Sequence, residues 1–295
     1  MLKSDSVLSP RHSVLPKGAA MANQAVKLSQ PVARRWPLIP FEIRLVLWWC
    51  FWLLVLLFLF SGRQIALGPI QIRTIALDWS FIAEWWPFIS KGVIITFELS
   101  IISMLCAVVL ALSAALARLS RVAPLNSFAS LYVSLMRGTP LFLQFIFIYS
   151  ALPQFGPRFV LNAFPSAVLA LSLNYGAYMS EIFRAGIQAV GRGQIEAAYA
   201  LGMTPWQTMR RIVLPQALRI ITPDIGNQFI AMQKDTSLAS AITLLELMGL
   251  ARQAGAPRQH YFEALVVAAI WYWLMTIVLS YFQRKLEHRM ARSDR

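Results

Sequence analysis

Residues 191–219 read GRGQIEAAYALGMTPWQTMRRIVLPQALR and hold the most specific local signals in the chain. Residues 194–201 favour a helix, and Gly202 permits the positive φ that ends one. A capping box with a proline at the first helical position follows, made by Thr204, Pro205 and Gln207. This second helix is predicted to run to about Leu214 and to stop at Pro215. The stretch therefore predicts a rigid elbow of two short helices.

Two interpretations of this elbow follow from its side chains. The small residues Ala197, Ala198 and Ala200 allow close packing against the first helix, while Trp206 and Met209 offer apolar side chains to a partner. An amphipathic segment that rests on a bilayer surface has a similar composition. Local chemistry alone leaves both interpretations open.

The composition around the elbow is that of an integral membrane protein. Of 295 residues, 58% are hydrophobic and only 14% are charged, which is too apolar for a water-soluble domain. A membrane span needs about 20 residues, so the chain accommodates about six spans and little else. Six apolar segments are candidates, at residues 45–60, 88–117, 138–153, 165–187, 217–235 and 263–283.

The basic residues set the predicted orientation. The net charge is +14, but the basic residues lie between apolar runs, which favours a positive-inside bias over nucleic-acid binding. Alternating spans from a cytoplasmic N-terminus put 20 of the 27 Lys and Arg residues on the cytoplasmic side, together with the C-terminus. The predicted division is a disordered cytoplasmic tail (1–44), an extra N-terminal transmembrane helix (45–61), a periplasmic loop (62–87), a transmembrane domain (88–285) and a cytoplasmic tail (286–295).

Small and aromatic residues predict packing features of the spans. A face of small residues recurs every four positions in the second span and predicts a close helix contact, through Ser103, Ala107, Ala111 and Ala115. Trp79, Trp85 and Trp86 precede that span and suit either an outer interfacial belt or packing on a partner. The chain shows no repeat of its own, so a second subunit is expected to supply the symmetry of a transporter.

Polar residues inside spans mark a candidate substrate pathway, because such residues are costly in a bilayer unless they serve a cavity or pair with one another. The candidates, whose side chains donate or accept hydrogen bonds, are Asn174, Tyr178, Glu181, Asn227, Gln228 and Asp235. The alternative is an interhelical network in which Arg137 neutralises Glu181 or Lys234 neutralises Asp235. Residues 137–140 are expected to mark a bend into the third span near the inner interface.

The elbow also carries a family motif. Its spacing resembles the E-A-A-x3-G-x9-I-x-L-P loop of ABC importer permeases at every defining position, and the residues that the resemblance implies for ATPase coupling are Glu196, Ala197, Ala198, Gly202, Trp206, Ile212, Leu214 and Pro215. Residues 137–144, 177–188 and 226–240 are similar to the histidine/glutamine branch of polar amino-acid permeases. The resemblance spans residues 88–285, with the coupling loop at 188–216.

The resemblance implies an all-α membrane protein of about six transmembrane helices, namely the five-helix type I importer core plus one N-terminal helix. It implies a permease of the bacterial inner membrane that moves polar amino acids by alternating access. The implied partners are ABC ATPase subunits that carry ATP and Mg, a second permease subunit (the same chain or a homologue) and an extracytoplasmic solute-binding protein.

Catalysis is not expected on this chain. A phosphate-binding loop needs a Gly-Lys pair, and the sequence contains none, so the ATPase is expected to be a separate subunit. No cofactor, metal site or catalytic residue is predicted, and Cys50 and Cys106 show no metal or disulfide spacing. The alternative function is an ion-coupled secondary transporter or channel with a proton relay through Glu98, Glu181 and Asp235. Glu98 also departs from the apolar residue expected at its position.

Overall fold

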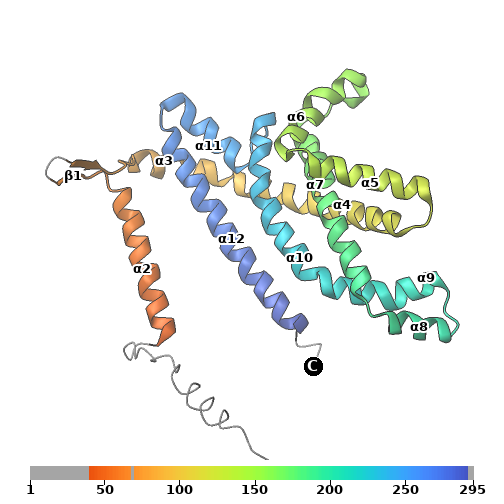
Figure 1. Ribbon diagram of the computed structural model, residues 1–295. Coiled ribbons are helices and arrows are strands. Elements are labelled where there is room, and N and C mark those ends of the chain that lie inside the picture. The colour runs from red at the N-terminus through yellow and green to blue at the C-terminus, as the bar shows by residue number, and fades with distance from the viewer. Residues whose placement is uncertain (1–39, 68–69, 292–295) are drawn as a thin grey trace, which may run out of the picture. The chain divides into compact units, whose positions relative to one another are not determined.

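The computed structural model describes residues 40–67 and 70–291, which form two compact units on either side of Ile75. The predicted disordered tail falls almost entirely outside these residues, as does the extreme C-terminus. The described part is nearly all helical, with one two-stranded sheet (Figure 1). The all-α prediction is therefore confirmed.

The first unit contains the extra N-terminal helix. Helix α2 spans Phe41–Leu59, and none of its residues is buried, as expected for an apolar helix that faces lipid. Strands β1 (Gln64–Leu67) and β2 (Ile70–Arg73) then pair antiparallel, with Gln64 opposite Arg73. Helix α2 thus begins four residues earlier than predicted, and the segment predicted as a loop contains a hairpin.

The second unit begins with a long, nearly continuous helix. Helix α3 (Trp79–Ser90) is capped by Asp78, whose side chain accepts hydrogen bonds from the N–H groups of Ser80 and Phe81. Helix α4 (Gly92–Leu119) follows after Lys91. The apolar span therefore starts well before residue 88, because its helix begins at the Asp78 cap, which precedes all three tryptophans in the chain.

Two of these tryptophans pack within their own unit, which neither predicted role described. The ring of Trp86 lies 5.4 Å from that of Trp271, and the guanidinium of Arg258 lies 4.0 Å from the ring centroid of Trp85. Trp79 is exposed. Two of the three rings consequently pack inside the unit, and one remains free for an interface.

The predicted third span at 138–153 contains a helix, but the helix that precedes it was not predicted. Helix α5 (Ala123–Gly138) starts directly after α4, and α6 (Leu141–Ala151) follows it across a bend of 108°. The break falls at Thr139 and Pro140, since proline lacks an N–H and restricts the residue before it. Residues 137–140 therefore separate two helices instead of leading from the inner interface into one. Helix α5 was missed because it is rich in serine.

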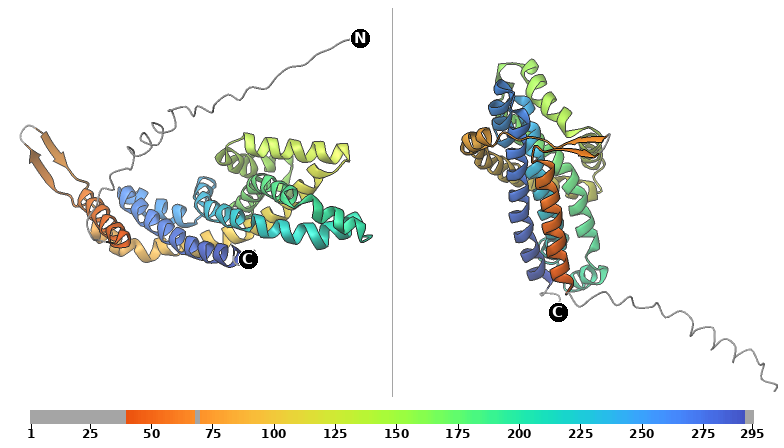
Figure 2. Two further views of the ribbon diagram at one scale, coloured as in Figure 1. Left: turned by 60° about the horizontal axis from the view of Figure 1, so that its bottom comes forward. Right: turned by 90° about the vertical axis from the view of Figure 1, so that its left-hand side faces the viewer.

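The remaining elements follow in chain order. They are η2 (Leu152–Phe155), η3 (Pro157–Phe159), α7 (Ala163–Ala189), α8 (Arg192–Ala200), α9 (Pro205–Thr208), η4 (Met209–Val213), α10 (Leu214–Asp235), η5 (Thr236–Ile242), α11 (Leu247–Gly255), η6 (Ala256–Arg258) and α12 (Tyr261–Ala291). Helix α10 packs against α7 on one side and α12 on the other (Figures 1 and 2). Elements α8 and α9 lie at the same end of this unit as the C-terminal end of α12, and α6 and α11 lie at the opposite end.

The predicted small-residue face of α4 is confirmed. Ser103, Ala107, Ala111 and Ala115 are fully buried, and α4 makes its most extensive packing contact with α7. Gly176 of α7 belongs to this contact, because a Cβ there would lie only 2.9 Å from the Leu110 side chain. Small residues thus allow the two helices to approach closely.

Within residues 40–67 and 70–291, three helical segments are long and apolar enough to span a membrane: α2, α3–α4 and α12. The bent pair α5–α6 makes a fourth. Helices α7 and α10 have 27 and 22 residues, which gives lengths of about 40 and 33 Å at 1.5 Å per residue. They are less apolar because they carry the polar residues of the candidate site. The count of six spans stays a prediction.

Candidate functional site

A cavity of 520 Å³ opens where the α5–α6 break faces α7 and α10. Its walls bring together segments about 100 residues apart in the chain. The lining residues are Arg137, Gly138, Thr139, Pro140, Leu141, Asn174, Tyr175, Tyr178, Gln228 and Asp235.

Two buried amides support the break beside this cavity. The Gln144 side-chain amide donates to the Met136 carbonyl and to the Thr139 hydroxyl, both at 2.8 Å. Asn174 donates to the same carbonyl at 3.2 Å and to the Gln144 side-chain oxygen at 3.1 Å. These bonds satisfy backbone groups that the end of α5 leaves unpaired. Asn174 therefore has a structural role as well as a place in the wall.

A cation lines one side of the cavity. The Arg137 guanidinium lies 5.3 Å from the ring centroid of Tyr178, within range of a cation–π interaction. Its Nη1 also lies 3.2 Å from Oε1 of Glu181. That carboxylate is bound at the same time by Arg118 at 2.7 Å and Arg184 at 2.9 Å. One carboxylate thus faces three guanidinium groups, and the cluster carries excess positive charge.

A carboxylate lines the cavity from α10. Asp235 Oδ2 accepts a hydrogen bond of 2.7 Å from the Tyr175 hydroxyl, which fixes the carboxylate against α7. Gln228 lies on the same helix and is half-buried. The cavity therefore presents a cation from α5, an anion from α10, and a neutral phenol and amide between them.

Four of the six predicted pathway residues line the cavity: Asn174, Tyr178, Gln228 and Asp235. Glu181 lies on the same face of α7 as Asn174 and Tyr178, but its arginine partners hold it outside the lining. Asn227 is exposed on another face of α10. Glu98 is exposed on α4 and does not line the cavity either. The interpretation that Arg137 pairs with Glu181 is confirmed by their contact.

Sequence reasoning missed Arg137, Thr139 and Tyr175 as cavity residues. Arg137 and Thr139 were assigned to the inner interface, because the third span was placed after them. The signal that would have found them is the Gly-Thr-Pro break itself, since irregular backbone at membrane depth is tolerated where it lines a cavity.

The elbow has the predicted local structure at its centre. Gly202 adopts φ +75°, and the Met203 N–H donates to the Ala198 carbonyl at 3.1 Å. Thr204 and Gln207 form both bonds of the capping box, at 2.9 and 3.3 Å. Helices α8 and α9 are therefore joined by a rigid turn.

The predicted stop at Pro215 is wrong. Helix α9 continues through a π-helical turn, η4, into α10, and Pro215 lies in the first turn of α10. The π-helical turn, with its i→i+5 hydrogen bonds, ends just before Pro215. The proline lacks an N–H group, and this lack is tolerated in the first turn of an α-helix. The elbow is thus directly continuous with a helix that lines the cavity.

The elbow divides into an anchored and an exposed surface. Ile187, Val190, Val213 and Ala217 form a buried apolar cluster, and Met209 packs against it instead of facing outward as predicted. On the free surface, Trp206 is 67% and Leu201 is 83% exposed. Among the predicted coupling residues, Ala198 is buried, Ile212 and Leu214 are half-buried, and the exposed ones are Glu196, Ala197, Gly202, Trp206 and Pro215.

Comparison with known proteins identifies this combination. Residues 107–292 match the family described as the binding-protein-dependent transport system inner membrane component. The chain belongs to this family. The resemblance found from the elbow motif is confirmed, and the matched residues include both the elbow and the cavity walls.

Individual relatives cover most of the second unit. The L-cystine transport system permease protein TcyB of Bacillus subtilis is 44% identical over 219 residues, which are 74% of this chain and 93% of TcyB. The glutamine transport system permease protein GlnP of Escherichia coli K12 is 36% identical and covers 72% of this chain and 97% of GlnP.

Solved structures agree with this fold. A crystal structure of an amino acid ABC transporter with histidines matches with a TM-score of 0.67 at 37% identity, over 73% of this chain and all of that one. The inward-facing MetNI methionine ABC transporter matches with a TM-score of 0.54 at 16% identity, over 71% and 99% of the two chains. The permease fold is therefore that of ABC importers.

Proposed function

We propose that this chain is the permease subunit of an ABC importer that moves polar amino acids across the bacterial inner membrane. The observation that carries the proposal is the cavity, which presents Arg137 and Asp235 from two helices at the α5–α6 break. Family membership and the amino acids in the names of the relatives support it.

The two charges suit the two ends of a zwitterion. The Arg137 guanidinium binds the substrate carboxylate, and Asp235 accepts hydrogen bonds from the α-ammonium group. Tyr178 and Gln228 then face the substrate side chain. Because Arg137 keeps its contact with Glu181, that carboxylate acts as a positioning residue for the guanidinium.

The elbow is proposed to dock on a separate ATPase subunit that carries ATP and Mg. Its exposed Trp206 and Leu201 supply apolar contacts, and the rigid turn at Gly202 fixes their direction. Since the elbow is continuous with α10, its displacement moves a cavity wall as a rigid body. Alternating access follows when the partner subunits close and open.

The complete importer is proposed to contain two permease subunits, two ATPases and an extracytoplasmic binding protein. The second permease is another copy of this chain or a homologue. In this assembly the elbow and both termini of the chain face the cytoplasm, in agreement with the distribution of basic residues.

The rival function, an ion-coupled secondary transporter, has weaker support. Its proton relay needs a connected path through Glu98, Glu181 and Asp235. Glu98 is exposed on α4, Glu181 is paired with three arginines, and only Asp235 lines the cavity. The ABC importer family is therefore the better account of the chain.

Substrate binding to the purified complex tests the proposed cavity. Arg137→Gln and Asp235→Asn are each expected to weaken amino-acid binding by about 1.5–3 kcal/mol, the usual contribution of a hydrogen bond to a charged group. Asn227→Leu is the matched control, because Asn227 is exposed on α10 outside the lining. Equal affinities for all four proteins would remove the cavity from the pathway.

A further inference from the structure

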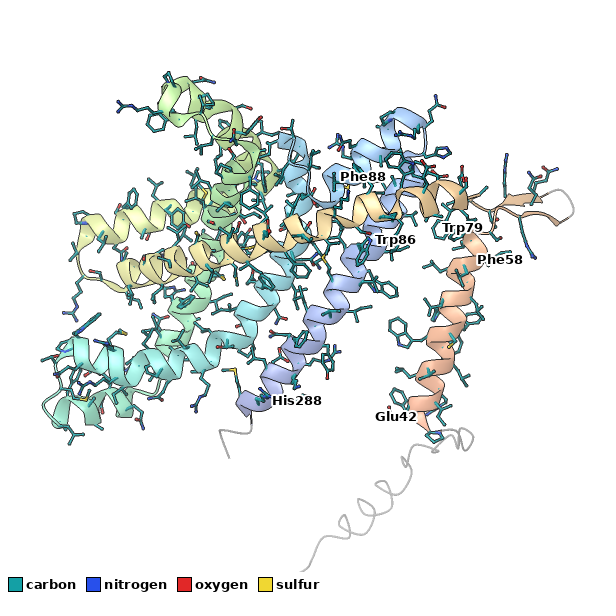
Figure 3. The ribbon with its side chains drawn as sticks, turned by 180° about the vertical axis from the view of Figure 1, so that it is seen from behind. Glu42, Phe58, Trp79, Trp86, Phe88 and His288 are labelled. Carbon is teal, nitrogen blue, oxygen red and sulfur yellow. The ribbon has the colours of Figure 1, made fainter. Side chains whose placement is uncertain are left out.

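The C-terminal end of α12 carries a cluster of exposed basic side chains that the transport function does not use. Arg284, Lys285, His288 and Arg289 line a hollow of 520 Å³ together with Tyr281. None of the four makes an ion pair within the described residues. We call these four residues the α12 basic face. In Figure 3, His288 marks its position near the end of the helix.

The acidic residue nearby points elsewhere. Glu287 accepts a hydrogen bond of 2.8 Å from Gln283, and the same Gln283 amide donates to the Pro223 carbonyl of α10 at 2.8 Å. These residues therefore occupy the side of α12 that packs on α10. The α12 basic face is directed away from that contact, and no acidic side chain of the described residues pairs with it.

The same side of the helix is apolar in the preceding turns. At 3.6 residues per turn, one face continues from Leu274, Ile277 and Val278 through Tyr281 into the α12 basic face. All three aliphatic side chains are exposed, as is the Tyr281 ring. We call Leu274, Ile277 and Val278 the α12 apolar face. One strip of surface thus changes from aliphatic to aromatic to cationic along the helix axis.

This sequence of surfaces follows the chemistry of a phospholipid. An acyl chain packs on aliphatic residues, tyrosine prefers the interface, and a phosphate binds to arginine and lysine. The α12 basic face lies at the same end of the unit as the elbow, the side proposed as cytoplasmic, where basic residues beside a span attract anionic lipid headgroups.

We propose that this strip binds one anionic phospholipid, with its acyl chain along the α12 apolar face and its phosphate among the residues of the α12 basic face. The bound lipid fixes the C-terminal end of α12 at the membrane surface, on the side that packs away from α10. The site is independent of the amino acid that the cavity accepts.

Native mass spectrometry of the full-length chain in detergent tests this site. Phosphatidylglycerol and phosphatidylcholine with identical acyl chains are added separately, and the fraction of protein with one bound lipid is measured. Phosphatidylglycerol is expected to bind more tightly. In the double variant Arg284→Gln and Arg289→Gln its affinity falls by about 30-fold, as the loss of two interfacial cations implies, while the affinity for phosphatidylcholine is unchanged.

The matched control is Arg121→Gln, because Arg121 is also exposed and lies on the predicted cytoplasmic side, in the turn between α4 and α5. This substitution removes one cation and leaves α12 unchanged, so the Arg121→Gln variant should bind phosphatidylglycerol as tightly as the unmodified chain. Equal binding of the two lipids, an unchanged double variant, or the same loss in the control and the double variant would each overturn the proposal.

Two further measurements identify the ligand and guard against misfolding. The double variant Ile277→Ser and Val278→Ser should bind phosphatidylglycerol more weakly. Inorganic phosphate at equal concentration should not displace the bound phosphatidylglycerol. Complete displacement would mean a free-phosphate site and contradict the lipid proposal. If the double variant does not fold, the unmodified chain decides: raising the salt concentration should release phosphatidylglycerol but not phosphatidylcholine, and equal release would refute the site.

Discussion

Gly202 provides the sharpest test of the elbow. It adopts φ +75°, and a Cβ at this position would meet no atom within 4 Å. Any effect of a substitution therefore comes from the backbone conformation and not from a clash. A left-handed residue other than glycine costs about 1–2 kcal/mol, which corresponds to about a 5- to 30-fold loss in binding if the docked elbow requires this turn.

Two variants separate this cost from other effects. Gly202→Val introduces a β-branched residue, for which positive φ is least favourable, whereas Gly202→Asn introduces the residue that best tolerates it. Affinity for the purified ATPase subunit is measured by titration, with thermal melting as the control for folding. Valine is expected to weaken ATPase binding by the stated factor and asparagine by much less. Equal affinities of the two variants at equal stability would refute the docking role of this turn.

Three further predictions concern other parts of the chain. Glu246→Leu, which leaves two backbone N–H groups and a buried hydroxyl unpaired, should lower the melting temperature clearly, and Glu98→Leu at an exposed site should not. Trp206→Cys in a background without native cysteines should react with an impermeant reagent only from the cytoplasmic side; labelling from outside would contradict the orientation. The hydrogen bond from the Ser80 side chain holds the pKa of Asp78 below its usual 3.8. The cap therefore stabilises α3 fully above pH 3.8, and this stabilisation is lost as the pH falls through the lowered pKa. Hydrogen exchange of the amides in the first turn of α3 measures this loss.

Features that depend on local chemistry were predictable from the sequence. The capping box at Thr204 and the positive φ of Gly202 involve residues within one turn of each other, so their residue types are sufficient to define them. The small-residue face of α4 was predictable for a related reason, because a four-residue period in one helix requires no knowledge of its neighbour. Four of the residues that line the cavity were identified for another local reason, because polar side chains within a span are costly unless they serve a cavity or pair with one another.

Features that depend on distant segments were not predictable in this way. Arg137 lines the cavity because α5 starts at Ala123 and ends at the break, which a hydropathy pattern interrupted by serines does not reveal. Met209 packs inward because the apolar cluster at the ends of α7 and α10 receives it.

Glu246 illustrates the limit most clearly. Its carboxylate is fully buried and accepts hydrogen bonds from the Met248 and Gly249 N–H groups and from the hydroxyl of Tyr272. Nothing in the local sequence distinguishes it from a surface glutamate at a helix start. The two N–H groups belong to its own helix, but Tyr272 comes from α12 and Thr96, whose hydroxyl lies 3.5 Å from the carboxylate, comes from α4. Only the folded chain brings these hydroxyl groups to Glu246.

Amino-acid uptake into proteoliposomes tests the central claim most directly. The permease is reconstituted with its ATPase and binding protein, and uptake of a labelled polar amino acid is measured with ATP on the side of the elbow, without ATP, and with an ion gradient alone. The account predicts uptake only with ATP and only when the ATPase is present. Uptake driven by the ion gradient in the absence of the ATPase would contradict it.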